Sequence, residues 1–227
     1  MITRTDQTAF FESLFTDDNA GHLELAREVT ERGGREELIS QLLWPALGMI
    51  DLLRRDDAVS DFNGRCAIRR IGSLARRGST RRDRYFRGRL TALVMCGEAA
   101  EDEVCADVAA NMLESLGAVA RMCGGGVPAP QIINELRNRP VDLLVIASIG
   151  PSEAPATRQL MDQVRELPIS IRPRIVAGGG LFARAEGLAL EMGADLELTD
   201  PIRLLEVFNL DSDCSMHALR RQRPHAA

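Results

Sequence analysis

The pattern of hydrophobic positions divides the chain into two parts near residue 80. Before that point, apolar residues recur at helical spacing, and after it short apolar runs of strand length alternate with helical patterns. The first of these runs, 90–95, leads into a glycine-containing loop and then a helical pattern. Loops that leave the carboxyl ends of parallel strands form the ligand crevice of open α/β sheets. We therefore expect a site at the loop that follows Met95.

Four amphipathic helical segments are predicted before the first strand. The third contains Pro45, which lacks a backbone donor and clashes with the preceding turn, so the helix must kink or restart there. Short connections and single apolar stripes favour an antiparallel bundle. The predicted segments cover 6–15, 22–31, 35–53 and 59–77.

Five apolar runs in the second part predict strands, and the third, Val141 to Ala147, is almost wholly apolar. Such a run is typical of a central parallel strand that is covered on both faces. The pattern also predicts a helix over 181–192 and a last helix from Pro201 to near Phe208. The predicted fold class is α/β, with an N-terminal helical bundle followed by a five-stranded doubly wound parallel sheet. The expected divisions are a bundle at 1–80, an arginine-rich linker at 81–89, a Rossmann-like domain at 90–209 and a mobile tail at 210–227.

Charge is distributed unevenly along the chain. All 28 basic residues are arginine, and ten of them lie between Arg65 and Arg89 with one acid, Asp83, for a local charge of +9. The net charge is −5, so the rest of the chain sums to −14. Arginine-rich surface binds acidic partners. We expect a contact surface for an acidic protein, with nucleic acid the less favoured partner and a solvated helix face the alternative, at Arg76, Arg77, Arg81 and Arg82.

Two residue types leave alternatives open. Trp44, the only tryptophan, either packs in the core or forms one wall of a ligand pocket. Cys96, Cys105 and Cys123 are placed to face one crevice, either as thiols of lowered pKa suited to redox sensing or as small buried apolar residues. Five cysteines without metal-type spacing predict reduced thiols.

The sequence shows no sign of a membrane-bound or exported chain. It contains no run of 18 uncharged apolar residues, and its first residues lack the basic-then-apolar order of a signal peptide. We therefore expect a cytoplasmic protein without membrane contact.

Positions 36 to 205 resemble the cobalamin-binding domain family with its helical-bundle partner. Four features occur in order: Gly117 lies 15 positions beyond Asp102, a glycine loop ends in Val127-Pro128, a serine follows the third strand, and a glycine run precedes Gly193-Ala194-Asp195. The resemblance implies a cobalamin-type fold. It also implies a cofactor site that contains Asp102, Cys105, Val127, Pro128, Ser148, Gly178, Gly179 and Gly180.

The departures from the family pattern concern the two faces of the corrin ring. The family motif Asp-x-His-x-x-Gly, whose histidine ligates cobalt, is occupied here by Ala100, Asp102 and Cys105. No histidine lies between His22 and His217, and the bundle lacks the family's tryptophan and Glu-His pair. The resemblance therefore implies that cobalamin binding is weakened or lost, or that cobalamin binds with its own base attached.

The layout is also similar to the haem-containing sensor domains of this family and to the photosynthesis-gene antirepressors of purple bacteria. Haem would take its axial ligands from cysteine thiolates or from His22, since His217 and His225 lie in the tail. The preferred interpretation is a non-catalytic regulatory protein that binds a protein partner such as a transcription regulator. The alternative is a corrinoid protein, either a light or redox sensor or a methyl carrier. No Ser/His/Asp set or Walker-type loop favours an enzyme.

Overall fold

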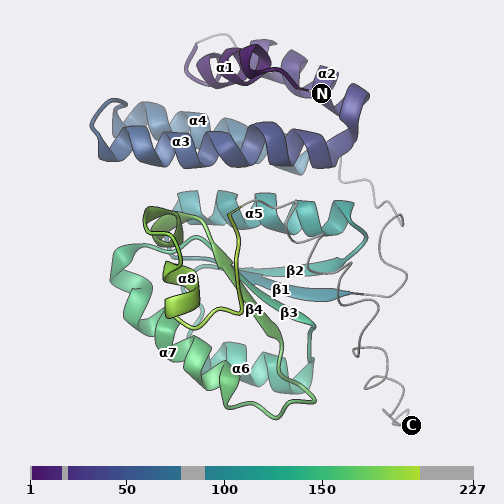
Figure 1. Ribbon diagram of the computed structural model, residues 1–227, viewed down its shortest axis with the longest axis vertical. Coiled ribbons are helices and arrows are strands. Elements are labelled where there is room, and N and C mark those ends of the chain that lie inside the picture. Colours follow the sequence, from purple (N-terminus) through teal and green to yellow (C-terminus); the bar gives the residue numbers. More distant parts are fainter. Residues whose placement is uncertain (1, 17–19, 78–89, 200–227) are drawn as a thin grey trace.

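The computed structural model describes residues 2–16, 20–77 and 90–199 as a stack of helical layers over a sheet (Figure 1). Helices α1 and α2 form the outermost layer, α3 and α4 the next, and α5 lies between them and the sheet. Helices α6 and α7 cover the opposite face of the sheet. The N-terminal elements are α1 (Arg4–Ser13), α2 (Ala20–Leu38), a π-helical turn (Ile39–Leu43), α3 (Trp44–Arg55) and α4 (Asp61–Arg76).

The predicted restart at Pro45 is confirmed. The π-helical turn ends at Leu43, and α3 begins at Trp44 with the proline in its first turn. Proline removes a backbone donor, and the π-helical turn directly before α3 interrupts the regular α-helical hydrogen-bond pattern. The predicted second and third helices meet at Gly34, whose φ of 84° lies in the left-handed region.

The predicted fold class is confirmed by a five-stranded, all-parallel sheet in the order β2-β1-β3-β4-β5. The strands are β1 (Thr91–Met95), β2 (Val119–Gly124), β3 (Leu143–Ala147), β4 (Arg174–Gly178) and β5 (Leu196–Glu197). The helices between them are α5 (Ala100–Ser115), α6 (Ala129–Asn138), α7 (Ala154–Arg165) and α8 (Leu188–Glu191).

The predicted single helix over 181–192 is wrong. A 3-10 turn, Gly180–Arg184, is followed by the short helix α8, and Gly187 with a φ of 79° separates them. A left-handed residue cannot continue a right-handed helix, so the chain turns there. The last predicted helix, the whole linker at 81–89 and the tail at 210–227 lie outside the described residues.

Helix α5 belongs to two cores at once. Its residues Ala106 and Leu113 pack against the sheet side chains Ala92 and Val94. Its opposite face, formed by Val104, Val108, Met112 and Leu116, completes the core of the bundle. Full burial of such a side chain is worth about 1.5–3 kcal/mol. The bundle is therefore attached to the sheet through a continuous apolar seam along α5.

Within the described residues, no helix combines the length and apolar character needed to cross a membrane.

Candidate ligand cavity between the bundle and the sheet

A cavity of about 860 Å³ lies where the carboxyl ends of the strands face α3 and α4. Its apolar wall includes Trp44, Leu47 and Phe182, and its polar lining includes Asp102 and Ser148. The volume falls within the range of about 300–1,000 Å³ that is usual for small-molecule sites. The position agrees with the expectation of a site at the loop that follows β1.

Most of the expected cofactor-binding residues lie around this cavity. The loops after β3 and β4 and the first turns of α5 contribute Asp102, Cys105, Ser148, Gly178, Gly179 and Gly180. The other two expected residues do not line the cavity. Pro128 lies directly before α6, and Val127 packs against the core that α6 and α7 form with the sheet. The described part of the chain contains no group of three or more His, Cys, Asp or Glu side chains arranged to hold a metal ion.

Ser148 joins three loops at the floor of the cavity. Its hydroxyl donates a hydrogen bond to Asp102 Oδ1, its backbone N–H donates to the Gly178 carbonyl at 2.7 Å, and its carbonyl accepts from Gly97 N at 2.9 Å. Its φ of 76° is unusual for a residue with a side chain. Such strain persists only where the surroundings determine the conformation, and it is concentrated at functional sites. The Asp102 carboxyl is therefore fixed in place.

A second carboxylate, Glu153, lies close to Asp102. It accepts hydrogen bonds from Glu98 N at 2.7 Å and from Gly150 N at 2.6 Å. A β-carbon added at Gly97 would lie 2.5 Å from both Asp102 Oδ2 and Glu153 Oε2, so these two oxygens are at most about 5 Å apart. The sequence carried no signal for Glu153, because its hydrogen bond from Glu98 joins two loops whose residues are 55 positions apart.

The pKa of Asp102 is raised above its ordinary value of 3.8. Burial is the main cause, the hydrogen bond from Ser148 opposes it, and the nearby Glu153 carboxylate adds to the rise. The Asp102 residue is only 8% exposed. The neutral, protonated form is therefore favoured in the folded protein relative to an exposed aspartate.

This rise makes stability depend on pH in a defined direction. Because the folded-state pKa exceeds the unfolded value, ionised Asp102 costs stability at pH values above 3.8, and the cost is full above the folded-state pKa. We expect Asp102→Asn, which keeps an acceptor for Ser148, to raise the melting temperature at pH 7. The gain should shrink as the pH falls towards 3.8. Thermal unfolding of both proteins between pH 3.5 and 7 checks this, and a constant loss at every pH would contradict it.

Burial also determines the protonation state of the thiols. It raises the pKa of Cys96 and of Cys105 to about 12, and it raises the pKa of Cys123 as well. The alternative of thiols with lowered pKa is therefore disfavoured. Of the four cysteines in the described ranges, Cys105 alone lines the cavity. Protonated Cys105 is a poor axial ligand for haem, and His22 is buried in the bundle, away from the cavity lining.

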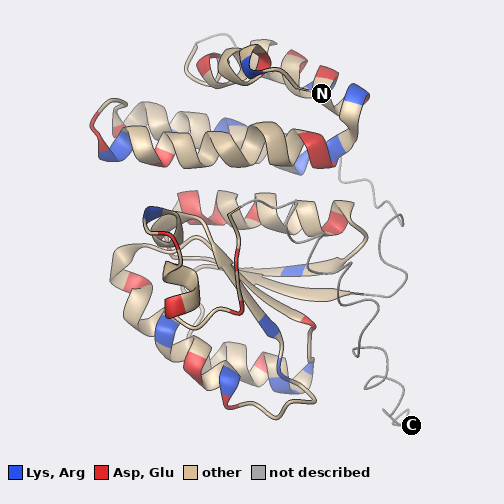
Figure 2. Ribbon diagram, viewed as in Figure 1, with Lys and Arg blue, Asp and Glu red and all other residues tan. Residues whose placement is uncertain are grey.

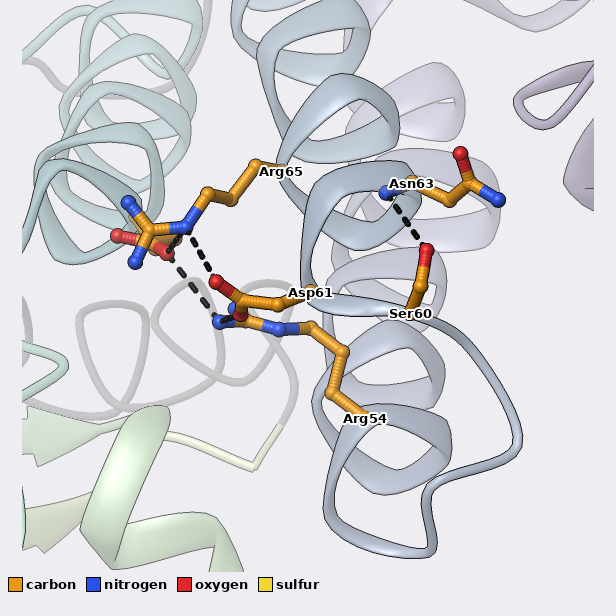
Figure 3. Close-up of polar contacts among 6 residues, drawn as sticks. Arg54, Ser60, Asp61, Asn63 and Arg65 are labelled. Carbon is orange, nitrogen blue, oxygen red and sulfur yellow. Dashed lines mark hydrogen bonds and ion pairs between the residues drawn. The ribbon is translucent and has the colours of Figure 1, made fainter.

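Two arginines and two carboxylates that line the cavity form ion pairs, and we call Arg54, Asp61, Arg65 and Glu101 the arginine–carboxylate cluster. Figure 3 labels Arg54, Asp61 and Arg65. Asp61 and Arg65 are more than half exposed to solvent, so the cluster lies at the mouth of the cavity. Arg54 pairs with Asp61, and Arg65 Nε lies 2.9 Å from Asp61 Oδ2. Both guanidinium groups also lie 3.4 Å from Glu101 Oε1. The cluster thus joins the ends of α3 and α4 to the first turn of α5.

Trp44 satisfies both of its alternatives. It packs against the bundle core and against the core between α5 and the sheet, and it also lines the cavity. Its indole Nε1 donates to the Thr199 carbonyl at 3.2 Å. The side chain therefore fills space between the two parts of the chain and forms a cavity wall.

The arginine-rich segment does not form one uniform surface in the described residues. Arg76 Nη1 lies 2.5 Å from Asp107 Oδ2 on α5, and Arg70 donates to the carbonyls of Leu14 and Thr16. Figure 2 shows arginines and carboxylates interspersed along the helices. Arg77 is exposed at the end of α4. Arg81 and Arg82 lie outside the described residues.

Comparison with known proteins finds similarity in structure only. No protein-family model and no curated protein matches the sequence. The monomethylamine corrinoid protein of Methanosarcina barkeri is similar with a TM-score of 0.72 and 14% identity, over 91% of this chain and 98% of that one. The methanol:cobalamin methyltransferase complex MtaBC from the same organism gives a TM-score of 0.47 at 13% identity, over 99% and 87%. A cobalamin-binding protein from Desulfitobacterium hafniense DCB-2 gives 0.46 at 13%, over 92% and 98%.

At 14% identity the first of these likenesses shows the fold alone. The arrangement of a helical bundle followed by a five-stranded parallel sheet is thus shared with a corrinoid protein, as the sequence resemblance implied.

Proposed function

We propose that this protein is a non-catalytic regulatory protein whose ligand site is the cavity between bundle and sheet, in which cobalamin or haem binding is weakened or lost, and which acts by contact with a protein partner. One observation carries the proposal. Beside the cavity, the buried carboxyl of Asp102 accepts a hydrogen bond from Ser148, at the position where the sequence resemblance implies the cobalt-ligating histidine. The partner class that we favour is a transcription regulator, by resemblance to the antirepressors.

The residues around Asp102 do not fit the histidine-ligated mode of cobalamin binding. Aspartate has no side-chain nitrogen to ligate cobalt, and the Asp102 carboxyl lies close to a second carboxylate, Glu153. The glycines of the β4 loop do not require a cofactor either. A β-carbon at Gly178 would meet Leu198, and one at Gly180 would meet Ser148 and Ile149, so packing alone accounts for both glycines. A corrinoid that keeps its own base needs no protein nitrogen, and this mode remains open.

The polar groups of the cavity support a binding role over catalysis. An activated serine is usually paired with a histidine base, but the Ser148 hydroxyl donates to the Asp102 carboxyl, and no histidine is among the described residues that line the cavity. The neighbouring thiol, Cys105, has a pKa of about 12 and is protonated at neutral pH. Neither group is therefore an effective nucleophile.

We place the partner surface at the end of α4 and beyond it, at Arg76, Arg77, Arg81 and Arg82. Arg76 keeps a side-chain exposure of 60% although it pairs with Asp107, so its guanidinium is still accessible. An acidic protein surface is the favoured partner there, and nucleic acid is the less favoured one.

A corrinoid protein, either a methyl carrier or a light or redox sensor, is the second candidate function. It is favoured by the 860 Å³ cavity under Trp44 together with the fold shared with a corrinoid protein.

Hydroxocobalamin separates the two candidates. Because Asp102 replaces the histidine, we expect no complex in which a protein nitrogen ligates cobalt, and the visible spectrum of a stoichiometric mixture measures this. A complex that keeps its own base would favour the corrinoid candidate, and an unchanged spectrum would favour the regulatory one. Protein nitrogen on cobalt would contradict both the assignment of Asp102 and the prediction. The absorption spectrum of the protein as isolated distinguishes corrin, haem and apoprotein.

A further inference from the structure

We propose that the arginine–carboxylate cluster is an electrostatic latch over the mouth of the cavity, which opens while the rest of the bundle stays attached to α5. The proposal rests on the proposed function only in treating the cavity as the ligand site. It assigns to Arg54, Asp61, Arg65 and Glu101 the control of access to that site.

The position of the cluster supports this role. Its four side chains come from the end of α3, the start of α4 and the first turn of α5, and all four line the cavity. Glu101 is the one member that belongs to the sheet half of the chain, and its Oε1 lies at ion-pair distance, 3.4 Å, from both guanidinium groups. Separation of Glu101 from the two arginines would therefore open the mouth.

Local structure positions the two arginines towards Glu101. The Ser60 hydroxyl accepts from Asn63 N at 3.3 Å and caps α4, which places Asp61 in its first turn. Gly64 leaves room for the Arg54 stem, because a β-carbon there would lie 2.5 Å from Arg54 Cδ. The pairing of Arg54 with Asp61 is thus built into the hairpin between α3 and α4.

The remaining contact between the bundle and α5 is much stronger than the latch. From Val104 onwards the seam is apolar, and α4 approaches so closely that a β-carbon at Gly72 would lie 3.2 Å from Val104. Each buried side chain of the seam contributes about 1.5–3 kcal/mol. The pairs that opening breaks join Glu101, whose side chain is 17% exposed, to Arg54 and Arg65, which are 23% and 56% exposed, each at 3.4 Å. Ion pairs that keep contact with solvent contribute about 0–1 kcal/mol each, which is less than the several buried side chains of the seam together. The mouth should therefore open without separation of the seam.

Opening of the latch would widen access to the predicted cofactor-binding residues of α5. Asp102 follows Glu101 in the first turn of α5, and Cys105 lies one helical turn further along on the cavity wall. Cys105 is only partly exposed and lines the cavity, so a rise in its modification rate reports wider access without any ligand.

Thiol labelling of the intact protein tests the proposal. The probe is N-ethylmaleimide, and the modification rate of each cysteine is followed by mass spectrometry of its peptide. Exposed Cys66 reports the activity of the reagent, and Cys96, which is buried between α5 and the sheet, reports global unfolding. We expect Glu101→Gln and Arg65→Gln each to accelerate Cys105 modification about fivefold and to leave Cys96 unchanged. Added salt should accelerate Cys105 in the wild type and much less in Glu101→Gln.

Two controls distinguish latch opening from a change in the intrinsic reactivity of the thiol and from a general loosening of the fold. Removal of a carboxylate and removal of a guanidinium shift the reactivity of a nearby thiol in opposite directions, so only opening predicts acceleration in both variants. Asp107→Asn is the matched control, because it removes an ion pair with Arg76 that also joins the bundle to α5 but lies outside this cavity. Opposite shifts, an equal acceleration in Asp107→Asn or a parallel rise at Cys96 would overturn the latch. None of these outcomes depends on cobalamin, whose titration tests the proposed function separately.

Discussion

A Gly180→Ala variant is expected to lose about 3 kcal/mol of stability, because the loop after β4 leaves no room for a side chain. The backbone at Gly180 has a φ of 52°, which costs a residue with a β-carbon about 1–2 kcal/mol. The added carbon would also lie 2.7 Å from the Ile149 carbonyl oxygen and 2.9 Å from its nitrogen, and it would overlap Ser148 Oγ. For a chain of this size the melting temperature should fall by roughly 10 °C, as measured by circular dichroism.

Gly187→Ala is the matched control for this loss. Gly187 also has a positive φ, of 79°, but nothing lies within 4 Å of the position that a β-carbon would occupy. The Gly187→Ala variant should therefore lose only the stability that a positive φ costs a residue with a β-carbon, about 1–2 kcal/mol. Equal losses in the two variants would show that the β3 and β4 loops do not approach as closely as the structure places them.

The strands could be predicted from the sequence because their burial is visible locally. Residues 143–147 are recognisable as a central strand since every side chain is apolar, and all five are buried on the two faces of the sheet. The helix predicted over 181–192 failed because Leu181, Phe182 and Leu188 have the same apolar pattern in a 3-10 turn followed by a short helix. Only the left-handed conformation of Gly187 separates the two pieces, and periodicity carries no information on it.

The sequence predicted the site residues that follow the ends of neighbouring strands. It did not predict the ion pairs between the bundle and α5. Asp102 and Ser148 follow β1 and β3, which are neighbours, so their loops had to meet. The contact of Glu101 with Arg54 and Arg65 depends instead on how the bundle lies on α5. Nothing in the separation of these residues along the chain indicates it.

The density of arginines along the sequence was a poor guide to surface charge in the described residues. A helix turns successive residues to different sides, so neighbours in sequence meet different partners. Arg70 therefore binds backbone carbonyls at the end of α1, while Arg76 pairs with Asp107 and Arg65 belongs to the cluster. These three arginines tie elements together, which removes part of the +9 charge from the surface expected to bind a partner.

Restoration of the histidine motif is expected to raise cobalamin affinity at least tenfold, or about 1.4 kcal/mol. The variant carries Ala100→Asp, Asp102→His and Cys105→Gly. Ala100 is exposed at the first position of α5, where the helix dipole favours an aspartate. An imidazole at position 102 would replace a buried carboxyl and would have Ser148 and Glu153 as hydrogen-bond acceptors close by.

The third change carries the main cost in stability. Glycine inside a helix costs about 1 kcal/mol relative to alanine, and the thiol that is lost lies near Gly179, whose added β-carbon would be 3.5 Å from Cys105 Sγ. We therefore expect a fold that melts a few degrees lower, with space opened next to the new imidazole.

The double variant Ala100→Asp with Cys105→Gly keeps Asp102 and isolates the contribution of the imidazole. Titration with hydroxocobalamin should show a protein nitrogen on cobalt in the triple variant alone, because only it provides one at the end of β1. A folded triple variant with the affinity of the double variant would show that Asp102 does not occupy the position of the ligating histidine.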